Sequence, residues 1–121
     1  LAPDLSESKR NIHHHYDISN DFYKLWLDRE ARQYTCAYFA DRTTPLEAAQ
    51  QAKKRHLAAK LALAEGQRVL DIGSGWGGFA LYAAGELGCR VTSITISREQ
   101  HDLARERVAL RHSFPGCTGH Q

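Results

Sequence analysis

The stretch Val69–Ala80, VLDIGSGWGGFA, decides the fold of this chain. An apolar run containing one acid, typical of a buried strand, leads into a segment with four glycines in six positions, and a helix-like sequence follows. Such a turn brings free backbone N–H groups and the positive end of a helix close to a ligand. Glycine is needed there because a side chain would block the approach or forbid the dihedral angles. The stretch therefore predicts a cofactor-binding turn.

Three ligand classes compete for this turn. A P-loop is excluded because the pattern GxxxxGK[ST] is absent. A dinucleotide site is favoured by Gly73, Gly75 and Gly78, which match GxGxxG, but the acid that should follow some 20 positions later is replaced by residues 95–97, TIS. The third class is S-adenosylmethionine, for which Asp71 lies two residues before the first glycine and could order the loop and face an ammonium group. We favour this third class, and a purely structural turn remains an alternative.

The flanking sequence predicts where helices and strands lie. Residues 67–110 read as strand, glycine loop, helix, strand and helix, which indicates a βαβα unit with two parallel strands. Before it, we expect a short helix over 19–27 with Phe22 and Trp26 in the core, and an extended segment over 32–40. A longer helix should run from Pro45 to about Ala64, capped by Thr44 and stopped by Gly66, with its apolar face formed by Leu46, Ala49, Leu57 and Leu61.

Composition limits the function classes. The 121 residues suffice for one domain at most, and a net charge of +2 is too small to argue by itself for nucleic acid, which we do not expect as a partner. No run approaches the roughly 18 apolar residues of a membrane span, and three cysteines without a CxxC pattern suit a reducing, cytoplasmic location. The absence of methionine and the changed composition of residues 109–121 predict a fragment with an atypical tail.

Four runs together resemble one known family: HHYDISNDFYKLWLD, YTCAYF, VLDIGSGWGGFALYAA and GCRVTSITISREQHDLARERV. They are similar, over residues 11–108, to the N-terminal half of cyclopropane-fatty-acyl-phospholipid synthases, a family that includes the mycolic acid cyclopropane synthases. The resemblance implies an α/β, Rossmann-like methyltransferase fold, truncated after the second strand and its helix. Residues 1–66 would form an N-terminal helical lid or cap, and residues 67–108 the start of the domain that binds S-adenosylmethionine.

The resemblance also implies a reaction. Family members transfer a methyl group from S-adenosylmethionine to the cis double bond of an unsaturated phospholipid acyl chain, and loss of a proton to bound bicarbonate closes the cyclopropane ring. The partners would be acyl chains at a membrane surface, reached by a cytoplasmic protein that attaches peripherally. Because the later part of the family's sequence is absent, we expect the isolated chain to be inactive.

The matching motifs carry site residues onto this chain. By resemblance, Tyr34 and Thr35 would contact the cofactor from the lid, and Cys36 would lie beside the bicarbonate. Thr95 and Gln100 would serve the adenosine side. The cradle itself would consist of Asp71, Gly73, Ser74, Gly75, Trp76 and Gly77.

Two basic or histidine-rich runs have plainer interpretations. Consecutive residues on a helix point about 100° apart, so His13, His14 and His15 cannot converge on one metal ion. The run 53–56, KKRH, could contact anionic lipid, but we favour a solvated helix face. Two competing functions stay open: a nicotinamide-dependent oxidoreductase, and a remnant without catalysis that keeps part of a cofactor cradle.

Overall fold

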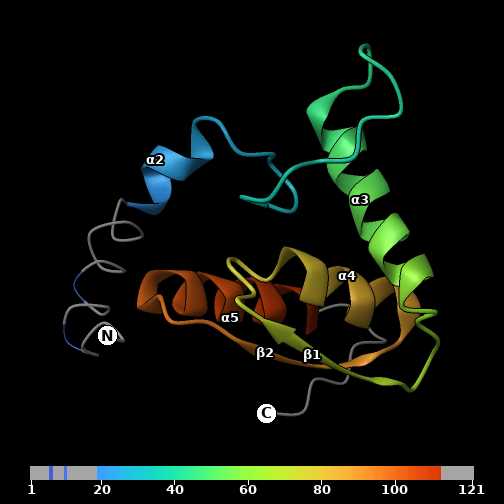
Figure 1. The fold of residues 1–121 in the computed structure, drawn as a ribbon. Helices are drawn as coiled ribbons and strands as arrows, with labels where there is room; N and C mark the ends of the chain where they lie inside the picture. Colours follow the sequence, from blue (N-terminus) through green and yellow to red (C-terminus); the bar gives the residue numbers. More distant parts are fainter. Residues whose placement is uncertain (1–5, 7–9, 11–18, 113–121) are drawn as a thin grey trace.

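The computed structural model describes residues 6, 10 and 19–112, and the histidine run 13–15 and residues 113–121 lie outside this part. Figure 1 shows the described elements in chain order: α2 (Asn20–Lys24), α3 (Leu46–Lys60), β1 (Arg68–Ile72), α4 (Gly78–Leu87), β2 (Arg90–Ile94) and α5 (Arg98–His112). The predicted order of helices and strands is confirmed, and residues 109–112 continue α5 rather than starting the atypical tail.

The predicted βαβα unit is confirmed. Strands β1 and β2 are parallel, with Asp71 opposite Ser93 and Ile72 opposite Ile94. Helices α4 and α5 lie on the same side of this sheet (Figure 1). Alternate strand residues face them, so Asp71 is partly buried, whereas Ile72 points to the other face and is 73% exposed. The glycine loop, residues 73–77, leaves the sheet at its carboxyl end and enters α4.

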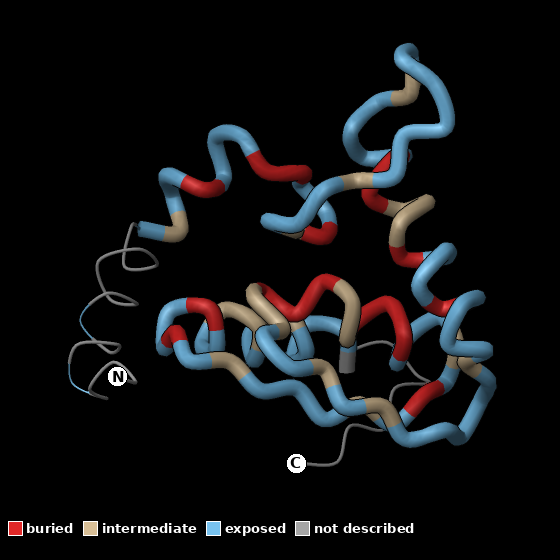
Figure 2. The backbone as a smooth tube through the Cα atoms, viewed as in Figure 1, coloured by how far each residue is buried: buried red, intermediate tan, exposed pale blue. Residues whose placement is uncertain are grey.

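The core joins α2 to the glycine loop. Tyr23, Leu27 and Trp76 form a buried cluster against which Leu103 of α5 packs, and the Tyr23 and Trp76 rings lie 4.9 Å apart. The indole Nε1–H of Trp76 donates to Asn20 Oδ1 over 2.8 Å, which satisfies its polar group as burial requires. Figure 2 shows buried positions in and just after α2, in the glycine loop, and along α3 and α4.

The predicted inner face of α2 is wrong. Phe22 and Trp26 are 46% and 47% exposed, whereas Tyr23 and Leu27 are 4% and 9% exposed. The helix ends at Lys24, and the two residues that reach the core are Tyr23 inside it and Leu27 just beyond it. The aromatic ring of Trp76 selects that pair, because it offers a partner to Tyr23.

The predicted inner face of α3 is right for Ala49 and wrong for the three leucines. Its buried residues are Ala49, Gln50, Lys54 and Ala58, while Leu46, Leu57 and Leu61 are 37%, 40% and 58% exposed. The small residues and long polar side chains allow α3 to approach α4 and the backbone of residues 33–38. Lys54 illustrates this packing, because it is 5% exposed and its Nζ lies 5.3 Å from the centre of the Tyr82 ring.

Both predicted ends of α3 need correction. Thr44 does not cap the helix, because its hydroxyl hydrogen-bonds to Asp41 Oδ1 at 3.2 Å, and Pro45 occupies the N-cap position. The helix ends before Gly66, in a Schellman motif in which Leu63 N–H donates to Ala58 O over 3.0 Å. The left-handed residue of this motif is Ala62, with φ of +48°.

The alanine at this left-handed position provides a test of the fold. Substituting Ala62→Gly should raise the free energy of unfolding by about 1 kcal/mol, because a left-handed backbone costs an alanine roughly 1–2 kcal/mol that glycine does not incur. Urea denaturation measures the difference. The matched control Ala59→Gly, inside the helix, should lower stability by about 1 kcal/mol. Destabilisation by both variants would contradict the assigned end of α3.

Candidate functional site

Hydrogen bonds to the end of the second strand hold the glycine loop in place. The N–H groups of Gly73 and Ser74 donate to Ile94 O over 2.9 and 3.1 Å. A Cβ atom added at Gly73 or Gly75 would meet nothing within 4 Å, and the φ of Gly75 is +54°. Within the part of the chain that the structure describes, the Gly75 N–H has no acceptor. The first half of the loop therefore presents bare backbone to open space, as a cofactor cradle requires.

The second half of the loop has a different reason to be glycine. A Cβ at Gly77 would lie 3.3 Å from the Ala104 Cβ of α5, and one at Gly78 would lie 2.4 Å from the carbonyl oxygen of Ala31. Trp76, which lies between Gly75 and Gly77 in the chain, is 2% exposed. These residues thus pack the loop against its neighbours, and the predicted cofactor contacts of Gly77 and Trp76 stay predictions.

Asp71 brings an unsatisfied acceptor to the start of the loop. Its Oδ2 atom is buried and has no hydrogen-bond partner within the described residues, and burial raises the pKa of the carboxyl above its ordinary value. An ionised carboxylate in such a place lacks the donor that normally compensates for lost water. The site is therefore complementary to a ligand group that carries both N–H donors and positive charge.

Two residues after β2, Thr95 and Gln100, contact each other, and their predicted role on the adenosine side stays a prediction. The Thr95 hydroxyl donates to Gln100 Oε1 over 3.3 Å, and both lie at the same end of the sheet as the glycine loop. Sequence reasoning missed the role of Ser97, which is 6% exposed and accepts the Gln100 N–H at its Oγ over 3.3 Å. A signal existed, since Ser-x-x-Gln at the start of a helix is a capping box.

The lid segment, residues 33–39, is an irregular extended stretch as predicted. The Tyr34 ring lies 5.9 Å from Tyr23 and 5.5 Å from Trp26, in edge contacts, and is 53% exposed. Because Tyr23 in turn contacts Trp76, a chain of aromatic rings links the lid segment to the glycine loop. Tyr34 can therefore present a ring near the cradle.

Thr35 and Cys36 are placed differently from Tyr34. The Thr35 hydroxyl accepts a hydrogen bond from Lys53 Nζ at 2.7 Å, so α3 holds it. Cys36 is exposed and takes part in none of the hydrogen bonds among the described residues. The structure does not bring Cys36 into contact with the cradle, and the assigned roles of both residues stay predictions.

The run 53–56 is only partly the solvated face that we favoured, because Arg55 and His56 are exposed while Lys54 is buried. Lys53 bonds to Thr35, Lys54 is buried over Tyr82, and His56 stacks on Tyr38 with ring centres 4.9 Å apart. Burial lowers the pKa of both lysines. The buried Lys54 is not placed to contact lipid, and a lipid contact by the rest of the run stays a prediction.

Among residues 6, 10 and 19–112, no group of His, Cys, Asp and Glu side chains could hold a metal ion. None of the described helices is both long and apolar enough to cross a bilayer.

The chain is similar in sequence to a known family of proteins. Residues 4–113 match the family described as mycolic acid cyclopropane synthetase. The chain is 50% identical over 97 residues to a probable fatty acid methyltransferase of Pseudomonas putida, covering 80% of this chain and 24% of that protein. It is also 50% identical over 93 residues to the cyclopropane-fatty-acyl-phospholipid synthase of Escherichia coli K12, covering 77% and 24%. The chain thus spans about a quarter of the length of these curated relatives.

Solved structures agree with the sequence comparison. The mycolic acid cyclopropane synthase CmaA1, complexed with SAH and CTAB, superposes with a TM-score of 0.79 and 36% identity, over 90% of this chain and 36% of that one. The two parallel strands with their helices therefore match part of a Rossmann-like methyltransferase fold. From its sequence, its fold and these matches, the chain belongs to the mycolic acid cyclopropane synthetase family.

Proposed function

We propose that the glycine loop binds S-adenosylmethionine. The observation that carries this proposal is the pairing of Asp71 Oδ2, a buried acceptor without a partner among the described residues, with the open backbone at Gly73 and Gly75. An amino acid ammonium group would supply the missing donors and charge. The absence of an acid in residues 95–97 argues against a dinucleotide, whose ribose hydroxyls such an acid would bind.

Each residue of the site then has a task that its position allows. Asp71 would accept hydrogen bonds from the ammonium group, and Gly73, Ser74 and Gly75 would line the cradle with backbone. When bound, S-adenosylmethionine supplies an activated methyl group on a sulfonium centre. The half-exposed ring of Tyr34 offers a π face to positive charge and helps to keep water away. Thr95 and Gln100, already paired, would border the adenosine side.

We propose further that this cradle serves methyl or methylene transfer to the cis double bond of an unsaturated phospholipid acyl chain. The proposal is supported by the names of the relatives, a fatty acid methyltransferase and a cyclopropane-fatty-acyl-phospholipid synthase. The chain spans about a quarter of the length of these relatives. Its described residues therefore support cofactor binding, which is one part of the reaction. An alkene is a weak nucleophile, so precise alignment with the methyl donor is the main requirement.

The structure gives less support for bicarbonate. Cys36, the residue proposed to lie beside it, is exposed and joins no described hydrogen bond. The position of Cys36 beside bicarbonate therefore stays a prediction, and we derive no proton transfer through bicarbonate.

The proposed cofactor is tested by isothermal titration with S-adenosylhomocysteine, with NAD as the competing ligand. The unchanged chain should bind the former, and Gly75→Val should weaken binding about 100-fold or more, since its side chain would enter the open space and strain the positive φ. Thr92→Val, on an exposed strand position, is the control and should bind normally. Binding of NAD alone, or unchanged affinity in Gly75→Val, would contradict the proposal.

Asp71 gives a second test, in which stability and binding move in opposite directions. Its folded-state pKa is raised, so ionised Asp71 disfavours the fold, and stability falls as pH rises through that pKa. Asp71→Asn should therefore stabilise the unliganded chain at neutral pH. The same variant should weaken S-adenosylhomocysteine binding about 10- to 100-fold, because it removes the charged acceptor.

The pH profile completes the Asp71 test. Binding by the unchanged chain should weaken as pH falls through the raised pKa, because the protonated carboxyl no longer pairs with an ammonium group. The Asp71→Asn variant should lack this step in affinity. Titrations at several pH values and thermal melts without ligand measure both effects. Loss of stability together with loss of binding would show that Asp71 is structural instead.

A further inference from the structure

One arginine of α5 joins the glycine loop to the turn that precedes the lid segment. The Arg107 Nη1 donates to Trp76 O over 2.6 Å and to Ala31 O over 3.4 Å, and Nη2 donates to Glu30 O. Arg107 itself is half-buried. A single guanidinium thus holds three backbone carbonyls from segments that lie more than 40 residues apart in the chain.

The turn on the N-terminal side of this contact, residues 28–32, is itself well defined. Asp28 is 2% exposed, and its carboxylate accepts the N–H groups of Ala31 at 2.7 Å and Gln33 at 2.9 Å. The Ala31 carbonyl lies so close to α4 that residue 78 can carry no side chain. Tyr34 follows two residues after this turn, so the position of the turn sets where the lid segment begins.

The chemistry of the contact requires arginine in particular. The guanidinium has five N–H donors in a planar fork, so it can serve several carbonyl acceptors at once. A lysine would bring one ammonium group, which cannot reach the same acceptors with the same directions. Arg111, one turn further along the same helix, makes a different contact. It donates to Leu81 O in α4 over 3.0 Å.

We propose that Arg107 is a positioning residue that holds the lid segment in register with the cofactor cradle. The inference rests on the proposed binding of S-adenosylmethionine. Arg107 fixes the carbonyl of Trp76 on the cradle side and those of Glu30 and Ala31 on the lid side. Its loss should let Tyr34 drift relative to Gly73 and Gly75, while the sheet and its two helices stay in place.

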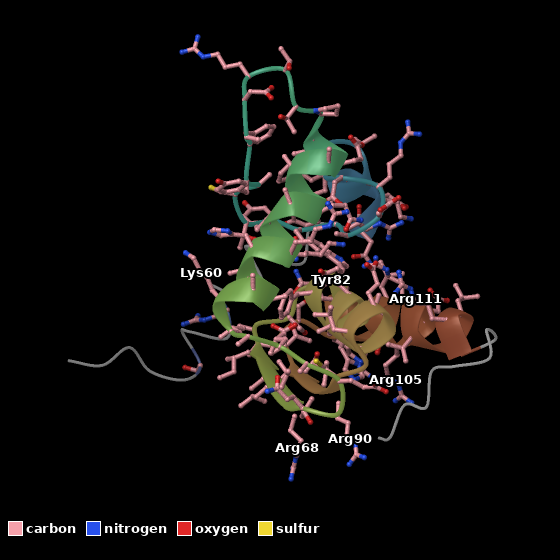
Figure 3. All side chains as sticks on the ribbon, turned by 90° about the vertical axis from the view of Figure 1, so that its right-hand side faces the viewer. Lys60, Arg68, Tyr82, Arg90, Arg105 and Arg111 are labelled. Carbon is pink, nitrogen blue, oxygen red and sulfur yellow. The ribbon has the colours of Figure 1, made fainter. Side chains whose placement is uncertain are left out.

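Arg111 offers a matched control for this proposal. It lies on the same helix and hydrogen-bonds to a backbone carbonyl, but its acceptor belongs to α4 and not to the lid segment or the glycine loop. Figure 3 shows Arg111 beside α4, on the side where Tyr82 also lies. An arginine-to-lysine change at either position keeps the charge and removes the fork, so the two variants compare a fork that holds the glycine loop and the turn before the lid segment with one that holds α4.

The experiment titrates S-adenosylhomocysteine into the unchanged chain, Arg107→Lys and Arg111→Lys. Affinity should fall about tenfold in Arg107→Lys, because the variant loses about the free energy of one hydrogen bond. Affinity should stay within about twofold of the unchanged chain in Arg111→Lys. Failure of the unchanged chain to bind would overturn the proposed cofactor and not this inference in particular. Equal affinities, or equal losses, in the two variants of a binding chain would overturn the role of Arg107.

A double-variant comparison separates positioning from general stability. If Arg107 acts through the lid, Arg107→Lys should weaken binding by less than about twofold in a Tyr34→Ala background, because the contact that it positions is already gone. Hydrogen exchange at residues 33–39 should rise in Arg107→Lys and not in Arg111→Lys. Additive losses of affinity with unchanged exchange would assign Arg107 a merely structural role. The exchange measurement also decides if a variant binds too weakly to titrate.

Discussion

The rest of the structure depends on one close approach, between the Ala31 carbonyl and the first residue of α4. A Cβ atom at Gly78 would lie 2.4 Å from that oxygen, so glycine is the residue that allows the contact. Around it, Trp76 packs on Tyr23, and Arg107 binds carbonyls on both sides. The N-terminal elements therefore pack directly against the glycine loop. A lid segment mounted in this way is placed by the same backbone that forms the cradle.

The four glycines of residues 73–78, three in the loop and one at the start of α4, divide into two pairs with different surroundings. Gly73 and Gly75 face open space, where a ligand could approach the backbone, while Gly77 and Gly78 lie against α5 and Ala31. The sequence motif does not distinguish the two pairs, because ligand access and close packing both require a residue without a side chain. Asp71, at the open pair, is the polar group that gives the space a chemical preference.

Much of the fold followed from the sequence, for identifiable reasons. The strands and helices from residue 67 onward were predicted because alternation and glycine punctuation are local signals. The inner face of α3 was predicted only at Ala49, because the apolar count also favoured Leu46, Leu57 and Leu61, whereas close packing selected small residues such as Ala58. The partners of Trp76 and Arg107, at Asn20 and Glu30, lie far away in the chain. No local pattern could have indicated these contacts, and the motif suggested a cradle role for a tryptophan that the fold buries.

The central claim is that the open half of the glycine loop, with Asp71, binds S-adenosylmethionine. A titration of the ¹⁵N-labelled chain with S-adenosylhomocysteine, followed residue by residue by NMR, tests this claim most directly. We predict the largest amide shifts at Gly73, Gly75 and Thr95, with little change at Arg68 and Arg90, which pair at the opposite end of the sheet. Shifts centred away from the glycine loop, or saturable shifts there with NAD instead, would contradict the account.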